Sequence, residues 1–359
     1  MEVTRKTKVE IIWNGKDVSN DVSEFLSSVT YTDREEEMSD DVTLTFDNSG
    51  GQWLEDWYPQ EGDTIAVKIG YNDKMLDCGL FEVDEITISG TPDVIDVKTI
   101  AAGATKAIRT RNCKAFENQT LKQIAKYFCT KYGFELIDTS SMLNQINLDR
   151  KTQENKTDLA FLSELSSEYG FIFSIRGNKM IFISYYDLDN MDAIKDIDKT
   201  DVSSYSITQK LYDTYASAEF KSRNPKKGKV IKKVVQETTL QGDSNNVLVV
   251  KNAGRDTQNA GAKAFAGIWN KNKMKQTADI SMDGDPELVS GISFNLTGLG
   301  LGSGKYHILK STHTISDSGY TTDLEVRKTG TIPKPKRMPK TVSSKKKKTS
   351  KLTGRLQDA

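Results

Sequence analysis

The period of the hydrophobic pattern changes along this chain, from two residues to between three and four and back to two, and this limits the folds that it can adopt. Residues 9–13 alternate between apolar and polar side chains and end at Asn14-Gly15. This dipeptide is favoured in two-residue hairpin turns because both turn positions need a positive φ. The same alternation returns at residues 42–46 and 65–71. We therefore predict an antiparallel β-barrel or β-sandwich domain over residues 1–104.

The apolar phase shifts between Val83 and Ile86, inside a segment that otherwise looks like one strand. Side chains alternate between the two faces of a strand, so one extra residue accounts for such a shift. The sequence predicts a β-bulge or bend there, a feature common in strands that close into barrels.

Two similar segments with helical spacing lie in residues 105–186. The first begins at Thr120, a residue type that caps helix N-termini, and ends at Gly133. The second runs from Thr157 to Gly170, and superposing the two glycines also superposes the two threonines. Each helix leads into a strand that begins with Phe. The matched caps predict an α/β module of two related helix–strand halves over residues 105–186.

Strand patterns return in residues 187–330, together with one helix predicted at about residues 257–272. The acidic segment that follows Asp187 lacks the glycine and the distal glutamate of a calcium-binding loop, so we expect a solvated linker. The predicted fold class is mainly β, with two β domains flanking a small α/β module.

Residues 331–359 differ in composition from the rest of the chain. They contain ten basic side chains and one acidic side chain, a net charge of +9. Because the whole chain is formally neutral, residues 1–330 carry −9. Pro333, Pro335 and Pro339 disfavour a helix, and a run of like charge repels itself. We predict an extended basic tail, with Lys345, Lys346, Lys347 and Lys348 as candidate contact residues.

Residues that could bind a metal or a cofactor lack the spacing that such sites need. His307 and His313 share one strand-like segment and, from their even spacing, one face, but no third ligand is suitably placed. The glycine-rich residues 298–304 do not match a dinucleotide-binding loop, and a strand rather than a helix follows them. Neither disulfide nor zinc spacing relates the three cysteines, Cys78, Cys113 and Cys129. We predict no metal site, no cofactor and no enzymatic activity.

Acidic residues also cluster between two predicted strands: Glu35, Glu36, Glu37, Asp40 and Asp41. Acid–base catalysis needs a carboxyl group whose pKa is raised by burial, and a loop this polar offers no such burial. We expect a solvated loop. Hairpin loops usually have two to five residues, so this longer one suits docking on a neighbouring subunit or tube ring.

The sequence gives no indication of a membrane or of specific nucleic-acid binding. No apolar run approaches the roughly 20 residues of a membrane-spanning helix. The N-terminus enters a strand pattern without a signal sequence, which indicates a protein that is made and kept in a cytoplasm. The four tryptophans do not interleave with basic residues, as a platform for stacking nucleotide bases would require.

Residues 283–328 resemble the C-terminal signature of the phage late control gene D family. That family includes the baseplate hub proteins of contractile phages and is similar to the N-terminal part of the VgrG spike proteins of type VI secretion. Residues 59–63, 70–71 and 78–86 look like the first barrel of the family. The features that carry the signature are Gly284, Pro286, Gly291, the connection to Ser303-Gly304-Lys305-Tyr306, His313, and Gly319-Tyr320-Thr321-Thr322.

The resemblance implies a structural hub in the baseplate of a phage, a bacteriocin or another injection system, assembled in the host cytoplasm. Each chain of a homotrimer would give two tail-tube-like β-barrels, so that six barrels join a sixfold tail tube to a threefold spike. The implied partners are a tube or tube-initiator protein, the central spike and the baseplate wedge proteins. The alternative is a tail module that binds or degrades cell-wall glycans.

Overall fold

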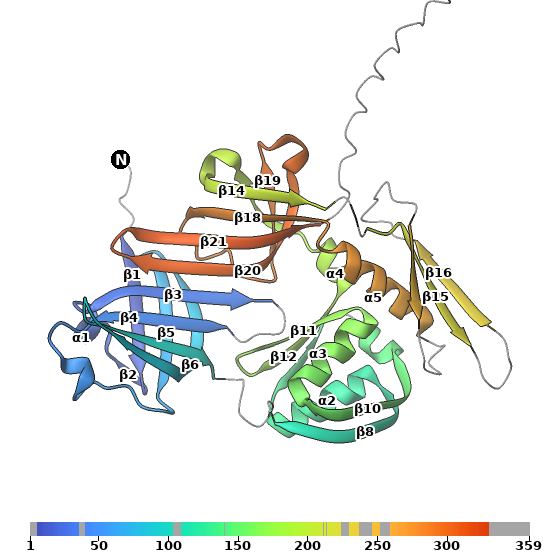
Figure 1. Cartoon of the computed structure of the whole chain (residues 1–359), viewed down its shortest axis with the longest axis horizontal. Helices are drawn as coiled ribbons and strands as arrows, with labels where there is room; N and C mark the ends of the chain where they lie inside the picture. Colours follow the sequence, from blue (N-terminus) through green and yellow to red (C-terminus); the bar gives the residue numbers. More distant parts are fainter. Residues whose placement is uncertain are drawn as a thin grey trace, which may run out of the picture.

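The chain is mainly β structure, with its three longest helices in the middle of its length (Figure 1). The computed structural model describes residues 6–35, 40–102, 108, 110–139, 141–210, 212, 214–223, 230–236, 246–251 and 259–329. Within these residues, one 13-stranded sheet contains strands from both ends of the chain, and three smaller sheets accompany it.

The first six-strand set comes from the N-terminal part and has the spatial order β3-β4-β7-β6-β5-β1, antiparallel throughout. The predicted hairpin turn is confirmed, because Asn14 and Gly15 have φ of 48° and 80° between β1 and β2. The elements of this part are β1 (Thr7–Trp13), β2 (Lys16–Asp17), α1 (Ser19–Val22), β3 (Leu26–Arg34), β4 (Asp41–Asp47), η1 (Gln52–Leu54), β5 (Thr64–Tyr71), β6 (Lys74–Ser89) and β7 (Val94–Ala101).

Alternating side chains of this set form one hydrophobic core. Val42, Leu44 and Phe46 of β4 are fully buried, and Trp53 stacks on Phe46 with ring centroids 4.1 Å apart. The register between β6 and β7 shifts between Val83 and Glu85, which confirms the predicted bulge.

The α/β module consists of two strand–helix–strand units and a closing strand. Thr120 and Thr157 cap their helices by accepting from the N–H groups of Gln123 (3.2 Å) and Ala160 (3.1 Å). Both helices end at glycines with positive φ, so all four predicted caps are confirmed. The elements are β8 (Arg111–Thr120), α2 (Leu121–Tyr132), β9 (Glu135–Asp138), η2 (Ser141–Gln145), β10 (Asn147–Thr157), α3 (Asp158–Tyr169), β11 (Phe171–Arg176) and β12 (Lys179–Ser184).

The second six-strand set has the spatial order β14-β18-β21-β20-β19-β13. Its elements are β13 (Ala193–Asp198), η3 (Lys199–Asp201), β14 (Val202–Gln209), β18 (Gln276–Asp283), β19 (Ser293–Thr297), η4 (Gly300–Gly302), β20 (Gly304–Ser316) and β21 (Gly319–Lys328). A small three-stranded sheet and a helix are inserted between β14 and β18, namely β15 (Ser217–Arg223), β16 (Val230–Gln236), β17 (Val247–Lys251) and α5 (Ala260–Asn272).

The solvated linker expected after Asp187 is wrong. This segment continues helix α4 (Tyr185–Asn190) and then forms strand β13. Asp189 is buried because Arg327 and Trp269 bind its carboxylate, partners that lie far away in the sequence.

The two six-strand sets share one topology. Numbered in chain order within each set, both have the strand order 2-3-6-5-4-1. They differ in one pairing, since β1 is antiparallel to β5 whereas β13 is parallel to β19. Strand β3 pairs with β20 and joins the sets edge to edge. In the part of the chain that the structure describes, no hydrogen-bonded pair closes either set into a barrel, so closure stays a prediction, as do the domain bounds 1–104, 105–186 and 187–330.

Candidate functional site

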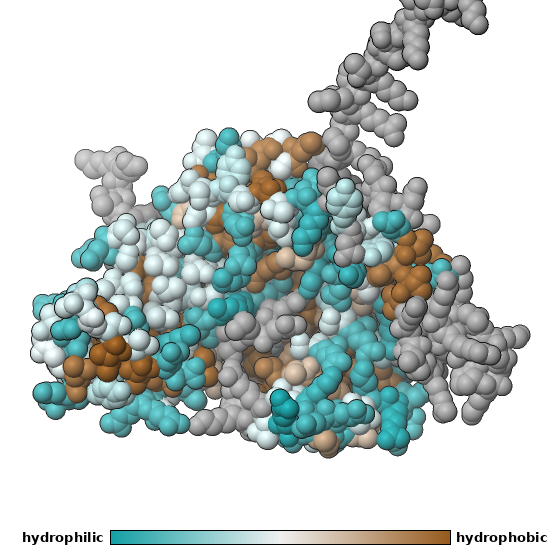
Figure 2. All heavy atoms as spheres, in the orientation of Figure 1, coloured by the Kyte–Doolittle hydropathy of each residue, from teal (hydrophilic) through white to brown (hydrophobic). Residues whose placement is uncertain are grey.

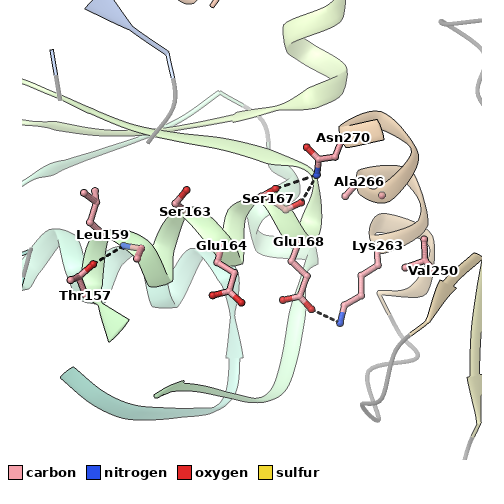
Figure 3. Close-up of a pocket in the computed structure, with 12 residues that line it drawn as sticks. Thr157, Leu159, Ser163, Glu164, Ser167, Glu168, Val250, Lys263, Ala266 and Asn270 are labelled. Carbon is pink, nitrogen blue, oxygen red and sulfur yellow. Dashed lines mark hydrogen bonds and ion pairs between the residues drawn. The ribbon is translucent and has the colours of Figure 1, made fainter. Parts of the chain in front are cut away.

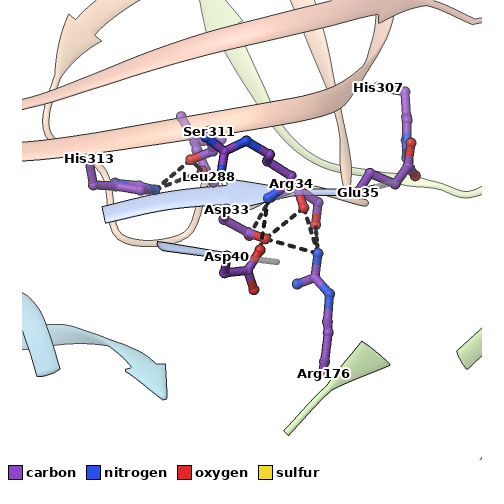
Figure 4. A network of polar contacts seen from close by, with 10 residues as sticks. Asp33, Arg34, Glu35, Asp40, Arg176, Leu288, His307, Ser311 and His313 are labelled. Carbon is purple, nitrogen blue, oxygen red and sulfur yellow. Dashed lines mark hydrogen bonds and ion pairs between the residues drawn. The ribbon is translucent and has the colours of Figure 1, made fainter. Parts of the chain in front are cut away.

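Asp33 is the point at which the three parts of the chain meet (Figure 4). It lies on β3, is fully buried, and accepts from the N–H (2.8 Å) and Oγ (2.8 Å) of Ser290, in the loop between β18 and β19. Arg176, at the end of β11, donates from Nη2 to Asp33 Oδ1 (3.0 Å) and to Ser290 Oγ (2.5 Å). One carboxylate thus ties the first set, the α/β module and the second set together.

His313 of β20 holds the same loop from its other side. Its Nδ1 lies 2.8 Å from Tyr320 Oη, and its Nε2 lies 2.6 Å from Ser311 Oγ, which donates to the carbonyl of Leu288 (2.6 Å). Burial lowers the pKa of His313 to about 4, so the ring is neutral near pH 7. His307 has different partners, because a bulge between Ile308 and Lys310 interrupts the even spacing of the two histidines.

The signature residues Gly284, His313, Tyr320 and Thr322 converge in space. The backbone N–H of Gly284 donates to the carbonyl of Tyr320 (2.8 Å), and Thr322 Oγ1 accepts from the N–H of Asp285 (2.9 Å). The ring of Tyr320 covers Gly284 so closely that a Cβ atom there would lie 2.1 Å from the ring. The glycine therefore permits this close contact.

Substituting Gly284 by alanine should lower the free energy of unfolding by about 1–3 kcal/mol, because the Tyr320 ring must move off His313 to make room. Chemical denaturation would measure the loss. Gly261→Ala is the matched control, since a Cβ atom there meets nothing within 4 Å. Equal stability of the two variants would show that Tyr320 moves without cost.

Glu35 does not belong to a solvated loop, which corrects the expectation for this residue. It is 5% exposed, and its Oε1 lies 2.5 Å from His307 Nε2. The sequence hides this contact because His307 follows 272 residues later. Glu36 and Glu37 lie outside the described residues, and so do Lys345, Lys346, Lys347 and Lys348.

Asp40 and Asp41 lie at the start of β4, beside the polar junction. Asp40 Oδ1 accepts from the N–H of Arg34 (3.0 Å), and Asp41 forms an ion pair with the Arg34 guanidinium. Burial, and then the charge of Asp33, raise the pKa of Asp40 to about 7. Both side chains are half-buried and support the strand pair β3–β4.

A second buried ion pair fixes the helices to the second set. Arg327 of β21 is fully buried, and its Nη1 donates to Asp189 Oδ1 (2.8 Å). Trp269 of α5 donates from Nε1 to the other oxygen of Asp189 (2.7 Å), and its ring lies 4.7 Å from the guanidinium. Tyr185 stacks on Trp269 at 3.6 Å. Helices α4 and α5 are therefore anchored to β21.

A groove of about 780 Å³ runs between α3 and α5 (Figure 3). Glu168 lies in it and pairs with Lys263 (2.8 Å) and with Lys151. Burial acts to raise the pKa of Glu168, but the two ammonium groups lower it below its usual value. Glu168 thus belongs to an ion-pair network with Lys263 and Lys151 on the wall of the groove.

An apolar patch remains on the surface at the α1 end of the first set (Figure 2). In this part of the chain Leu54 is 50% exposed, Trp57 is 39% exposed and Tyr58 is 44% exposed. A groove of about 280 Å³ lies beside Trp57 and Tyr58, and Trp13 and Trp53 also line it. Such patches commonly mark contacts with other proteins. Among the residues with described positions, no group of three potential ligands could hold a metal ion, and no helix could span a membrane.

Comparison with known proteins finds relatives among phage proteins. No protein-family model matches the chain. The probable baseplate hub protein of Escherichia phage P2 is 26% identical over 174 residues, which cover 48% of this chain and 44% of the relative. The chain is similar to phage baseplate hub proteins. It spans less than half the length of that relative, and the resemblance to baseplate hub proteins is confirmed.

Solved structures show the fold. The 43 kDa tail protein of prophage MuSo2 from Shewanella oneidensis has 15% identity and a TM-score of 0.69, over 90% of this chain and 98% of that one. A chain of the Francisella PdpA-VgrG complex has 10% identity and a TM-score of 0.53, over 93% and 61%. The mainly β fold is thus that of phage tail proteins.

Asp33, Arg176 and Ser290 were missed by reasoning from the sequence. No motif marks them, and each residue type at its own position is ordinary. The signature residues could be found only through the resemblance, because Gly284 and Tyr320 meet across 36 residues of chain.

Proposed function

We propose that this chain is a structural hub subunit of a contractile phage tail or tail-like particle, with a structural rather than an enzymatic role. One observation carries the proposal: a single chain contains two six-strand sets with the same strand order. The similarity to baseplate hub proteins supports it. The β3–β20 pairing and the buried junction at Asp33 would keep the two sets in a fixed relation, as a rigid ring requires, and the Asp189 pair would fix helices α4 and α5 to the second set.

Three copies of such a chain would present six similar β units in a ring. A ring of this kind matches a sixfold tail tube on one side and a threefold spike on the other, because closed rotational contacts produce rings rather than fibres. The proposed partners are the tube or tube-initiator protein, the central spike and the wedge proteins of the baseplate, with assembly in the bacterial cytoplasm.

The mass of the purified full-length chain, alone and with its tube and spike proteins, tests this proposal. Three chains per complex are expected. A chain that stays monomeric in the presence of both partners would contradict it.

The acidic residues Glu36 and Glu37 are proposed to dock on a neighbouring subunit or tube ring. Reversing both charges to lysine should weaken assembly while leaving the melting temperature almost unchanged, because surface charges contribute little to stability. Glu35→Lys is the contrasting variant and should lower the melting temperature, since Glu35 is buried against His307. Unchanged assembly of the Glu36/Glu37 variant would assign the loop to plain solvent-exposed surface.

The basic tail, residues 331–359, is proposed as an electrostatic tether to an acidic surface of the spike. At physiological salt, screening limits the interaction between exposed charges to about 8 Å, so the tail and its partner must be in contact. Truncation after Thr329 should reduce spike retention mainly at low salt, which a pull-down over a salt series would measure. Equal spike retention by the truncated and full-length chains at every salt concentration would favour a solubilising role of the tail. Spike retention that changes only when DNA is added would favour phosphate binding by the tail.

A further inference from the structure

Several strand edges lack a partner in the part of the chain that the structure describes, and two of them, on β14 and β6, concern the contact between the two sets. Strand β14 pairs only with β18, so its outer edge is open. Strand β6 pairs with β5 only as far as Glu82, whereas it pairs with β7 as far as Ser89. Among the described residues, its edge on the β5 side is therefore open from Glu85 to Ser89. Open edges expose unpaired N–H and C=O groups and readily accept another strand.

The contact between the two sets inside one chain shows what such edges can bind. Strand β3, the second strand of the first set, pairs with β20, the fifth strand of the second set, over residues 310–316. This lies just beyond the point where β19 stops pairing with β20, at His307. In the opposite sets, β14 is the second strand of the second set and β6 is the fifth strand of the first set. The open edges are therefore the counterparts of the paired ones.

Bulges at matching places fix which residues correspond. The pair β3–β4 shifts register between Leu26 and Ser28, and the pair β14–β18 shifts between Val202 and Ser204. This equates Ser28 with Ser204, and each later residue of β3 with the residue 176 positions further on.

The fifth strands give the second correspondence. The pair β6–β7 shifts between Val83 and Glu85, and β20–β21 shifts between Ile308 and Lys310. Glu85 therefore corresponds to Lys310. Glu85 and Lys310 are 225 positions apart. Independently, the fourth strand stops pairing with the fifth at Glu82 in the first set and at His307 in the second, and these two residues are also 225 positions apart.

We propose that β14 of one chain pairs antiparallel with β6 of a second copy, as β3 pairs with β20 within a chain. The inference rests on the proposed function, because it describes the contact that would close the ring of three chains. Transferring the register of β3 and β20 gives the residue pairs directly. They are Lys210 with Glu85, Gln209 with Ile86, Thr208 with Thr87, Ile207 with Ile88, and Ser206 with Ser89.

The residues that this register brings together are chemically matched. Lys210 and Glu85 have opposite charges, which are favourable when directly across an antiparallel pair. Ile88 is 50% exposed in the single chain and would be covered by Ile207, which packs at the edge of the core of the second set. Their counterparts within one chain, Tyr31 and His313, are both buried.

The polar face of the contact is matched as well. Thr87 opposite Thr208 repeats the pairing of Thr312 with Thr32 within the chain. Ser89 opposite Ser206 repeats that of Thr314 with Thr30, whose hydroxyls lie 3.5 Å apart. A shift by one residue in either direction would separate Lys210 from Glu85 and place every isoleucine opposite a polar residue, although one of the two shifts would bring Lys210 opposite Asp84 instead. The matched register is therefore the favoured one, and the occupant is a second copy of this chain.

A cysteine pair tests the register directly. Residues directly opposite in an antiparallel pair have Cα atoms about 4.5–5.5 Å apart, within the range that a disulfide spans. In a Cys113→Ser background, which removes the exposed cysteine, Thr87→Cys combined with Thr208→Cys should give covalent dimers and trimers on non-reducing gels. Both threonines are exposed in the single chain, so neither change disturbs a core. The control combines Thr87→Cys with Ile207→Cys, whose side chains would point to opposite faces and should not cross-link.

The outcomes separate this inference from the proposed function. A complex with the mass of three chains that does not cross-link through the matched pair, or that cross-links equally through the control pair, would overturn the strand pairing and leave the hub function standing. A chain that remains monomeric with its tube and spike proteins would overturn both.

A charge exchange gives a second measurement that needs no disulfide. Glu85→Lys alone and Lys210→Glu alone should each reduce the fraction of trimer, because each places like charges opposite one another. The double exchange should restore it. Loss without restoration would contradict the pairing of these two residues.

Discussion

Asp189→Ala is expected to lower the free energy of unfolding by about 3–5 kcal/mol, the largest loss that we predict for a single substitution in this chain. Arg327 is fully buried, and removing the carboxylate would leave its charge without a counter-ion in the core. Trp269 Nε1 would lose its acceptor as well. Chemical denaturation of the full chain, followed by tryptophan fluorescence, would measure the change.

A double variant separates the lost charge pair from lost packing. Asp189→Leu combined with Arg327→Met removes both charges and should recover most of the stability, since apolar replacement of a buried ion pair is often nearly neutral. If Asp189→Ala costs less than about 1 kcal/mol, water or a structural adjustment compensates Arg327, and the pair does not anchor α4 and α5 to β21.

Asp33→Ala should cost about 2–4 kcal/mol, because it removes the acceptor of the N–H and Oγ of Ser290 and the counter-ion of Arg176. The expected cost is smaller than for Asp189 because the Arg176 side chain is 34% exposed and water can reach it. The loss should also loosen the contact between the three parts, which limited proteolysis would detect as earlier cleavage.

The matched control is Asp21→Ala, which removes an exposed carboxylate 3.7 Å from Lys16 and should change the stability by less than about 0.5 kcal/mol. Similar values for Asp33→Ala and Asp21→Ala would show that the polar junction does not hold the three parts together.

Local features of this fold were predictable from the sequence because local chemistry determines them. The turn at Asn14-Gly15 needs positive φ, and the helix caps at Thr120 and Gly133 need a side-chain acceptor and a left-handed residue. The bulge near Val83 followed from a shift in the alternating pattern. All of these depend on residues a few positions apart.

The features that matter most for the proposed function are not local. Strand β3 pairs with β20 across 276 residues between Arg34 and Lys310, and no short-range pattern indicates such a pairing. The shared strand order of the two sets is hidden in the sequence because the insertion from β15 to α5 interrupts the second set. Equivalent positions also carry different residues, such as Tyr31 and Ile207.

Buried charge misled the prediction in the same way at two places. The segment from Asp187 and the loop at Glu35 were expected to be solvated because each is acidic. Asp189 and Glu35 are buried instead, because Asp189 pairs with Arg327 and Glu35 pairs with His307. Both partners lie on strands that are distant in the sequence. A carboxylate with a distant partner cannot be distinguished from a solvated one by composition.

A cryo-electron microscopy reconstruction of the full-length chain in its tail complex, without imposed symmetry, would show whether each chain supplies two β units to one ring. We expect a ring of three chains around a central channel, with six similar β units of two alternating kinds. A ring built from six chains, or a complex that contains one copy, would contradict the proposal that each chain supplies two units to the ring.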